Sequence, residues 1–148
     1  MIANWKDWIA AFDMACGTDD WAPLAAYLTE DVVYLVAGAP FACELRGRDA
    51  VIAGLQKSVR GFDHKFDPRV WEGVGIKVWG AEAVTARAKG TYRIAGKPAL
   101  SFAANGSWYF RGAQICLMTD IYDLSEVDSM DALNWLGLHG AGMDPSYV

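Results

Sequence analysis

The sequence predicts a single α+β domain over residues 1–148, in which N-terminal helices are followed by four long antiparallel strands. Its length of 148 residues and mass of 16.2 kDa suit one domain with a sizeable core. Apolar residues recur at helical spacing over much of the N-terminal part. From about Phe62 the period changes to two, and three glycine-containing turns divide the rest of the chain into runs of strand length.

Two helices are predicted before the first strand. The first contains an apolar stripe and ends near Gly17. This stripe consists of Trp5, Trp8, Ile9 and Phe12. Asp19 or Asp20 can cap the second, shorter helix, which tolerates Pro23 in its first turn and ends near Thr29.

A short strand and a third helix come next. The β-branched run at 31–36 predicts the strand, which stops before Gly38 and Pro40. The loop 41–47 leads to a helix from Asp49 to Arg60, whose apolar residues again share one helical face.

The C-terminal half is predicted to form a meander of long strands. Hairpin turns separate strands at 70–79, 82–94, 99–110 and 114–124. A last helical stretch follows at 125–136, and residues 137–148 are expected to form a mobile tail.

The second long strand carries small residues on one face and basic residues on the other. Ala86, Ala88 and Gly90 stand in the middle of the small face. A curved sheet with such a face leaves room for a cavity against the helices. Alternatively, the first helix packs closely against these small residues. The pattern alone leaves both interpretations open.

Composition and charge exclude several classes of protein. Thirteen basic and eighteen acidic residues give 13 − 18 = −5, which argues against nucleic acids and anionic membranes as partners. A hydrophobic content of 53% with 21% charged residues excludes intrinsic disorder. The N-terminus lacks the apolar run of a signal peptide, and no stretch approaches the roughly 18 apolar residues of a membrane span. We therefore expect a cytoplasmic protein.

The cysteines and the known catalytic motifs add further expectations. Cys16, Cys43 and Cys116 are odd in number, far apart and in no paired motif, so reduced, buried thiols are predicted. The sequence has no metal-ligand triad, phosphate-binding glycine loop or Ser-His nucleophile motif. Neither a metal nor a cofactor is therefore expected.

Three local motifs stand out within this order of elements. YLTEDVVY at 27–34 leads from the second helix into the first strand, RGRDAV at 46–51 leads into the third helix, and DIYDL at 120–124 lies on the last strand. Together they resemble the SnoaL-like branch of the nuclear transport factor 2-like (NTF2-like) superfamily. This branch includes polyketide cyclases, ketosteroid isomerases and limonene epoxide hydrolases. The resemblance covers residues 5 to 136.

The resemblance implies a cone-shaped, curved sheet wrapped around the N-terminal helices, with a pocket for a hydrophobic small molecule. The chain departs from the epoxide hydrolases at two places. It has Val36 where they carry an Asn, and Ala88-Lys89-Gly90 where they carry an Arg-x-Asp. In that family the Asn and the Arg-x-Asp belong to the water-activating network. This chain lacks them, so epoxide hydrolysis is expected only as an alternative activity.

Asp120 is the first candidate catalytic residue. It lies within an apolar strand, between Met118 and Tyr122 on one face. Burial disfavours a charged carboxylate and raises its pKa toward the range useful for proton transfer. By similarity with cyclases and epoxide hydrolases, Asp120 occupies the position of a pocket carboxylate. The alternative is a structural aspartate near the rim of the sheet.

The resemblance also points to Tyr34 and His64 as catalytic residues. Tyr34 matches a tyrosine that helps to hold a water in the epoxide hydrolases, and its phenol could donate to a substrate oxygen. His64 lies near a histidine base of the dehydratases, whose partner aspartate would fall near Cys16 and Gly17. A core tyrosine and a surface or hydrogen-bonded histidine are the alternatives.

Aromatic residues are predicted to form the walls of the pocket. Strand alternation places Tyr122 and Trp108 on the face of Asp120, where their rings could stack on a flat substrate. The other predicted substrate contacts are Tyr92, Phe102, Val36 and Phe12. As ordinary core residues these side chains would need no such role.

The sequence thus predicts a cofactor-independent enzyme that uses general acid and base catalysis on a hydrophobic cyclic or aromatic molecule. The expected class is a lyase, isomerase or cyclase; an epoxide hydrolase-like enzyme and a non-catalytic binding protein are the alternatives. Leu117 and Ile121, on the outer face of the last strand, predict a homodimer through the outer face of the sheet.

Overall fold

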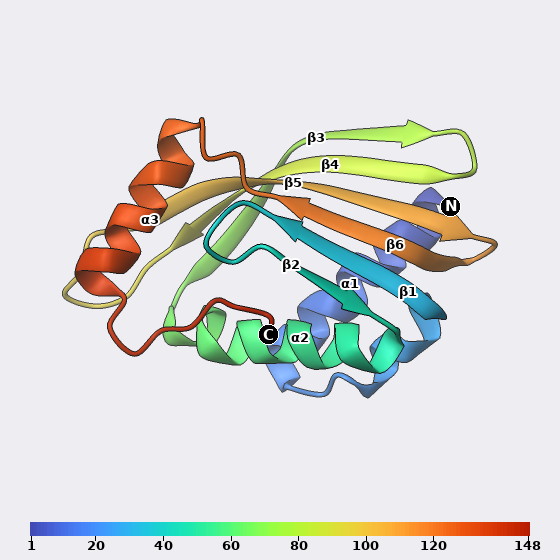
Figure 1. Ribbon diagram of the computed structural model, residues 1–148, viewed down its shortest axis with the longest axis horizontal. Coiled ribbons are helices and arrows are strands. Elements are labelled where there is room, and N and C mark those ends of the chain that lie inside the picture. The colour runs from blue at the N-terminus through green and yellow to red at the C-terminus, as the bar shows by residue number, and fades with distance from the viewer.

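A six-stranded sheet and the helices on one of its faces make up the computed structural model, which describes residues 1–148 (Figure 1). The strands are β1 (Leu28–Ala37), β2 (Cys43–Arg46), β3 (Arg69–Trp79), β4 (Ala83–Tyr92), β5 (Leu100–Arg111) and β6 (Gln114–Ile121). Their order in the sheet is β2-β1-β6-β5-β4-β3. The four long strands of the predicted meander are therefore confirmed, each within a few residues of its expected bounds.

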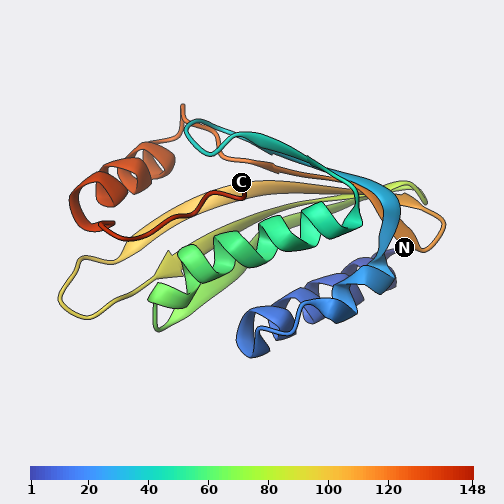
Figure 2. The ribbon, with the colours of Figure 1, turned by 60° about the horizontal axis from the view of Figure 1, so that its bottom comes forward.

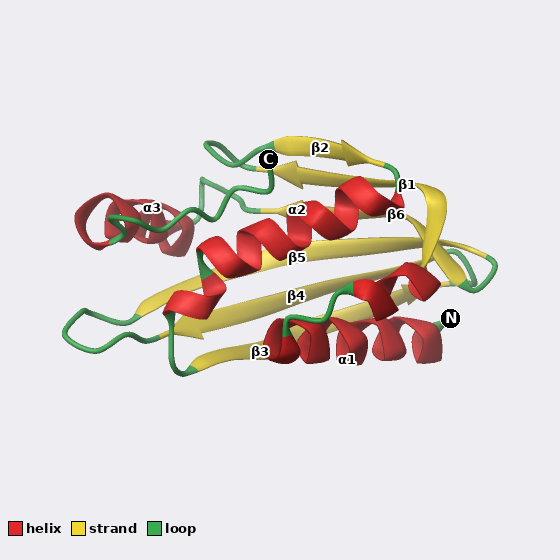
Figure 3. Ribbon diagram, turned by 90° about the horizontal axis from the view of Figure 1, so that it is seen from below, coloured by secondary structure: helices red, strands yellow, loops and turns green.

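The helices are α1 (Ile2–Thr18), the 3-10 helix η1 (Ala22–Tyr27), α2 (Arg48–Gly61), the short 3-10 turn η2 (Asp63–Lys65) and α3 (Val127–His139). Views from the helix side show α1 and α2 crossing the same face of the sheet (Figures 2 and 3). The sheet curves around them, as the α+β prediction requires. None of the helices is long and apolar enough to span a membrane.

The structure corrects the predicted antiparallel sheet of five strands in two places. The loop expected at 41–47 contains a sixth strand, β2, which pairs antiparallel with β1 from Val33–Arg46 to Val36–Cys43. The first strand also pairs in parallel with β6, so the sheet is mixed. Both features depend on pairing between distant segments, which local hydrophobic periodicity does not report.

The second predicted helix is a six-residue 3-10 helix, and it ends earlier than expected. Leu28 and Thr29 belong to β1, and Leu28 is completely buried opposite Ile115 of β6. Burial in the sheet therefore outweighs the helical spacing of the apolar residues in this segment. The prediction that this helix ends near Thr29 is wrong by about two residues.

Two apolar clusters stabilise the arrangement. The larger one joins α1, η1, α2, β1 and β6 and contains residues such as Trp8, Leu24, Val32 and Val51. The smaller one joins the end of α2 to β4, β5 and α3 through Phe62, Phe66, Tyr92, Leu100 and Trp135. The space between these clusters is where the cavity lies.

The C-terminal segment turns back from α3 toward α2 (Figures 1 and 2). The last helix ends at His139 rather than at residue 136. Residues 144–148, which we call the strap, then lie against α2, where the backbone amide of Asp144 donates to the carbonyl of Gly61 over 3.1 Å. The segment expected to be mobile thus has defined packing in the structure.

Candidate functional site

A cavity of about 450 Å³ lies between the helices and the curved sheet. This volume is in the range of small-molecule sites. Most of its 38 lining residues, 26 of them, are hydrophobic, so the cavity suits an apolar ligand. α1 contributes its predicted stripe, Trp5, Trp8, Ile9 and Phe12, and the sheet contributes Ala86, Ala88, Ala104 and Gly106.

The alanines of β4 and β5 therefore line the cavity, whereas the ring of Trp108 lies directly over Gly106. Ala86 pairs with Gly106 and Ala88 pairs with Ala104 across the two strands. Larger side chains at the three alanines would fill part of the cavity. The structure thus supports the first of the two interpretations of this pattern, since α1 stands away from these residues.

Asp120 faces this cavity from β6, next to Val36 of β1 and Gly106 of β5. The hydroxyl of Tyr34 donates to Asp120 Oδ2 over 2.5 Å. No side chain or backbone group hydrogen-bonds to Oδ1, so this oxygen is available to a ligand. No Lys, Arg or His forms an ion pair with the carboxylate.

This environment alters the acidity of Asp120. Burial among apolar atoms raises the pKa of the carboxyl group to about 6, and the hydrogen bond from Tyr34 lowers it in part. Part of the side chain still has accessible surface because it lines the cavity. A carboxyl group with this pKa can take up and release a proton near neutral pH.

Three tyrosines surround Asp120. Burial raises the pKa of Tyr34 and of Tyr122 well above the ordinary value, and it raises the pKa of Tyr147 to about 12. The charge of Asp120 adds to the increase at each of them. All three phenols are therefore neutral near pH 7 and can act as hydrogen-bond donors.

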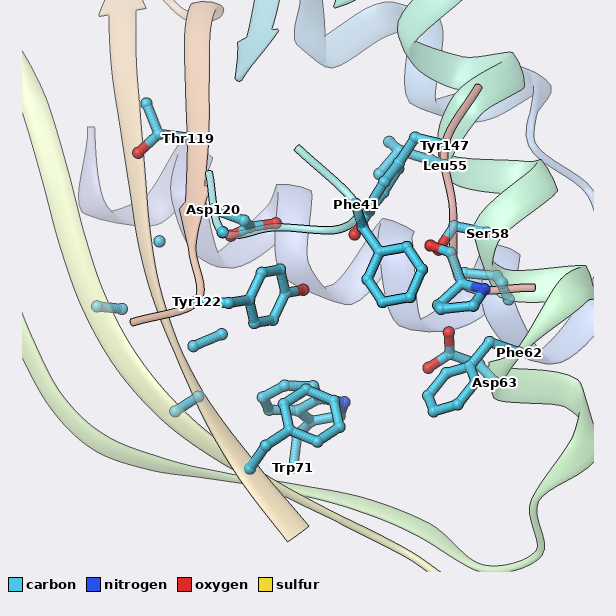
Figure 4. Close-up of a pocket in the computed structure, with 18 of the residues that line it drawn as sticks. Phe41, Leu55, Ser58, Phe62, Asp63, Trp71, Thr119, Asp120, Tyr122 and Tyr147 are labelled. Atoms are coloured by element: carbon cyan, nitrogen blue, oxygen red, sulfur yellow. The ribbon is translucent and has the colours of Figure 1, made fainter. Parts of the chain in front are cut away.

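A second polar cluster lines the cavity away from Asp120, on the side of α2 and β3. Arg69 donates to Asp63 Oδ1 over 2.8 Å, and the hydroxyl of Tyr92 donates to the same oxygen over 2.9 Å. The indole of Trp71 donates to the Tyr92 hydroxyl over 3.0 Å. Asp63 and Asp120 stand on opposite sides of the hollow in Figure 4. Asp63 thus has the cation of Arg69 beside its carboxylate, which Asp120 lacks.

Most of the predicted site residues come together in this cavity. Those that line it are Asp120, Tyr34, Tyr122, Trp108, Tyr92, Phe102 and Phe12. Val36 does not, because its side chain is buried in the larger apolar cluster. His64 is also absent from the lining.

His64 makes a structural contact instead. Its Nε2 lies 2.7 Å from the backbone carbonyl oxygen of Cys16. The expected position of its partner on the first helix is therefore correct, but a carbonyl oxygen replaces the carboxylate of a catalytic pair. The placement favours the alternative of a hydrogen-bonded histidine. Burial raises the pKa of the Cys16 thiol to about 11, so this cysteine is not a nucleophile near neutral pH.

The cavity residues that sequence reasoning missed include Asp63, Arg69, Trp71 and Tyr147. Asp63 directly precedes His64, and of these two neighbours only Asp63 lines the cavity. Arg69 and Trp71 begin β3, where alternation could have assigned both to the inner face. Tyr147 belongs to the strap, and its local sequence carries no signal of a cavity contact.

Comparisons with known proteins bear on the fold. No protein-family model matches the sequence, and no curated protein does so either. One similar solved structure is an LEH-like epoxide hydrolase from M. tuberculosis. It is 20% identical, with 89% of this chain and 93% of that chain covered and a TM-score of 0.58. An NTF2-like protein from Anabaena variabilis is 15% identical, with 82% and 88% covered and a TM-score of 0.62.

A third similar structure is a hypothetical protein with a ketosteroid isomerase-like fold from Catenulispora acidiphila, in complex with trimethylamine. It is 19% identical, with 81% of this chain and 88% of that chain covered and a TM-score of 0.58. These likenesses show that the chain has the NTF2-like fold, which confirms the predicted resemblance at the level of architecture. This fold carries enzymes as well as proteins of other kinds, so the activity has to be argued from the site.

Proposed function

We propose that this protein is a cofactor-independent enzyme that transfers protons on a hydrophobic cyclic or aromatic molecule. The observation that carries the proposal is Asp120, a carboxylate in an apolar cavity whose only hydrogen bond comes from a neutral tyrosine. Such a group is costly to bury. A carboxyl group with a raised pKa in a cavity is typical of functional sites. An isomerase, lyase or cyclase needs only this kind of proton transfer.

The geometry suggests how the step would proceed. Asp120 Oδ1 takes a proton from a carbon next to a carbonyl group, and the C–H electron pair forms an enolate. The hydroxyl of Tyr122 donates a hydrogen bond to the enolate oxygen. Asp120 then returns its proton to another carbon in an isomerisation, or a neighbouring group leaves with its electron pair in an elimination.

This assignment changes the role of Tyr34. Its single hydroxyl proton is directed at Asp120, so it is not free to polarise a substrate oxygen. Tyr34 instead orients the carboxylate, leaving Oδ1 toward the cavity. Tyr122 is a neutral phenol that lines the same cavity and is not directed at Asp120, so the donor role passes to it.

The cavity also suggests the shape of the substrate. Its walls are aromatic, and Phe102 stacks on Tyr92 with ring centroids 5.3 Å apart. Its polar groups include Asp120 on one side and the Asp63–Arg69 pair on the other. A flat ring system with a carbonyl near Asp120 and a polar substituent near Arg69 would satisfy both.

Exchange of carbon-bound hydrogen offers a test that does not require the natural substrate. The bicyclic ketone 2-tetralone is incubated in D₂O, and loss of its α-proton signal is followed by NMR. We expect the wild type to accelerate exchange and Asp120→Asn to lose about a thousandfold of that acceleration. The control is Asp31→Asn, an exposed carboxylate paired with Arg111, which should behave as wild type.

The same variant separates an enzyme from a binding protein. Asp120→Asn keeps the shape of the cavity, so it should retain the affinity for 2-tetralone measured by quenching of tryptophan fluorescence. Binding of the ketone without any exchange above the uncatalysed rate would contradict the proposal and favour a binding protein.

Epoxide hydrolysis is the second candidate, because an epoxide hydrolase is among the similar structures and the resemblance assigns both Tyr34 and Asp120, which are hydrogen-bonded to each other, to the site. Val36 is buried in the core and cannot hold a water there. Hydrolysis of styrene oxide in H₂¹⁸O, with label in the diol, would favour this candidate over proton transfer.

The homodimer is proposed on the exposed apolar residues of the outer sheet face. Tyr109 on β5 is 41% exposed and Ile121 at the end of β6 is 45% exposed. A second copy would cover them. Analytical ultracentrifugation should show a species of twice the chain mass, and Ile121→Lys should convert it to single chains. A species of one chain mass alone would contradict the dimer.

A further inference from the structure

The strap, residues 144–148, is held on α2 by a set of hydrogen bonds. Lys57 donates to Asp144 Oδ2 over 2.8 Å and to Ser146 Oγ over 2.6 Å. The hydroxyl of Ser58 donates to the carbonyl oxygen of Pro145 over 2.8 Å. The strap therefore has a specific docking position, with contacts from both its backbone and its side chains.

The surface of α2 is shaped to receive the strap. Gly54, Ser58 and Gly61 follow one another at spacings of four and three, so they lie on one face of the helix. A methyl group on Gly61 would overlap the carbonyl oxygen of Asp144. One on Gly54 would overlap the side chain of Leu45 in β2 and approach the carbonyl oxygen of Tyr147 to 3.0 Å. Two glycines within a helix are unfavourable for helix stability. Close approach of the strap gives them a physical reason.

The docked strap places Tyr147 in the wall of the cavity. Its ring meets the ring of Tyr34 edge to face, with centroids 5.3 Å apart. Pro145 of the strap lines the cavity as well. In Figure 4, Tyr147 and Leu55 stand on the helix side of the hollow, across from Asp120 and Tyr122. The strap thus completes the apolar surroundings of the Tyr34–Asp120 pair.

We propose that the strap is a gate for the cavity and that Tyr147 is a positioning residue, which excludes water from Asp120 and holds the ring of Tyr34. Docked on α2, the strap closes the chamber around the carboxylate. Released, it admits water and ligand from the side of α2. The proposal rests on the assigned role of Asp120, since it explains how that role is regulated.

The other groups that face Asp120 belong to the sheet and its continuation. Tyr34 comes from β1, and Tyr122 directly follows β6. The charged groups that line the same cavity are Asp13, Asp63, Arg69 and Arg87, and each of the last three is held in an ion pair. Tyr147 differs because it lies in the strap, whose hydrogen bonds to the rest of the protein all go to α2. The strap is therefore the part that can move without disturbing the sheet.

Gly61→Ala tests the gate, and Gly137→Ala is its matched control. Both are helical glycines, but a methyl group at Gly137 has no atom within 4 Å. The first readout is hydrogen exchange of the strap amides. The second is titration of the Asp120 carboxyl carbon by ¹³C NMR. We expect Gly61→Ala to speed strap exchange at least tenfold and to lower the titration midpoint of Asp120 by about one unit or more, because water then reaches the carboxylate.

A second pair of variants tests Tyr147 without changing α2. Tyr147→Ala removes the ring and should lower the Asp120 midpoint as Gly61→Ala does, whereas Tyr147→Phe keeps the ring and should restore the wild-type value. These two Tyr147 variants also test the proposal if Gly61→Ala does not fold. Faster strap exchange with an unchanged Asp120 midpoint would overturn the proposal, as would a Tyr147→Ala midpoint equal to that of the wild type.

These readouts do not depend on catalysis. If Asp120→Asn keeps full proton exchange on 2-tetralone, the proposed function fails, yet the titration still reports whether the strap controls the carboxylate. If the function stands, Gly61→Ala should also move the acid limb of the pH–rate profile to lower pH, in step with the carboxyl titration. A profile that stays in place while the titration moves would overturn the regulatory role.

Discussion

Asp120 and Asp63 face the same cavity, but the groups around them differ. Asp63 has the guanidinium of Arg69 at 2.8 Å and shares a hydrogen bond with Tyr92. Asp120 has only the neutral hydroxyl of Tyr34. A nearby cation satisfies the charge of a carboxylate, whereas apolar burial without one favours the protonated form. The same type of side chain is therefore held in an ion pair on one side of the cavity, and on the other side it is the group to which we assign proton transfer.

The largest expected difference concerns turnover. Asp63→Asn keeps Asp120 and its tyrosines in place, so kcat for proton exchange on 2-tetralone should stay within about tenfold of wild type, against the roughly thousandfold loss in Asp120→Asn. A rise in KM would show that Asp63 and Arg69 contact the polar end of the ligand. Equal losses of kcat in the two variants would break the distinction between the two carboxylates.

The second difference is in the pH dependence of stability. The pKa of Asp120 is raised from 3.8 to about 6 in the folded state, so this group stabilises the fold below about pH 4, and that contribution is lost as the pH rises through 6. Its full size is about 3 kcal/mol, from the shift of roughly two units. The free energy of unfolding of wild type minus that of Asp120→Asn should fall by this amount between pH 3 and pH 7 in urea denaturation.

Asp123→Asn is the control for this measurement because its sign is opposite. Hydrogen bonds from the side chain and backbone of Ser125 lower the pKa of Asp123. Its contribution is present at neutral pH and is lost as the pH falls, so the corresponding difference should rise with pH. A difference for Asp120→Asn that rises in the same way would show that its carboxylate is stabilised as an anion.

A smaller effect is expected when the cation beside Asp63 is removed. Arg69→Met leaves a carboxylate whose side chain is only 13% exposed without its ion-pair partner. The free energy of unfolding should fall by about 2 kcal/mol, less than for a fully buried pair because both side chains retain some exposure. Adding Asp63→Asn to Arg69→Met should recover most of the loss. Thermal unfolding of the three variants gives the comparison, and an unchanged stability in Arg69→Met would indicate that the pair is not stabilising.

The smallest expected effect concerns Tyr34. Because its hydrogen bond lowers the pKa of Asp120, Tyr34→Phe should raise the midpoint of the carboxyl group above 6, by about one unit. The acid limb of the pH–rate profile should shift upward equally. Tyr109→Phe, which changes an exposed tyrosine of β5, should leave the profile unchanged. A downward shift in Tyr34→Phe would mean that water replaces the phenol as donor.

The parts of the site that were predicted from the sequence are those set by local pattern. Asp120 stands out because a carboxylate in an apolar strand needs a physical reason, and alternation along β5 and β6 places Trp108 and Tyr122 on its face. Phe12 follows from the apolar stripe of α1. Period and burial cost are properties of neighbouring residues, so one sequence suffices to detect them.

The parts that were missed depend on contacts between distant segments. The parallel pairing of β1 with β6 and the short strand β2 exist only once the sheet is assembled. The ion pair of Asp63 with Arg69 looks like ordinary surface charge in the sequence. The resemblance points to the neighbouring His64 as the catalytic residue of this segment. Tyr147 lies in a segment rich in small and polar residues, which is typical of a mobile tail. Its docking depends on two glycines more than 80 residues earlier in the chain.

The titration of Asp120 in the wild-type protein tests the account most directly. Uniform ¹³C labelling gives the carboxyl signals, and the signal that is missing in Asp120→Asn identifies the residue. A midpoint near pH 6 is expected, because the carboxylate is buried among apolar atoms with one tyrosine as its only partner. A midpoint near the ordinary 3.8 would contradict the account, since Asp120 would then be a solvated or well-paired anion with no special basicity.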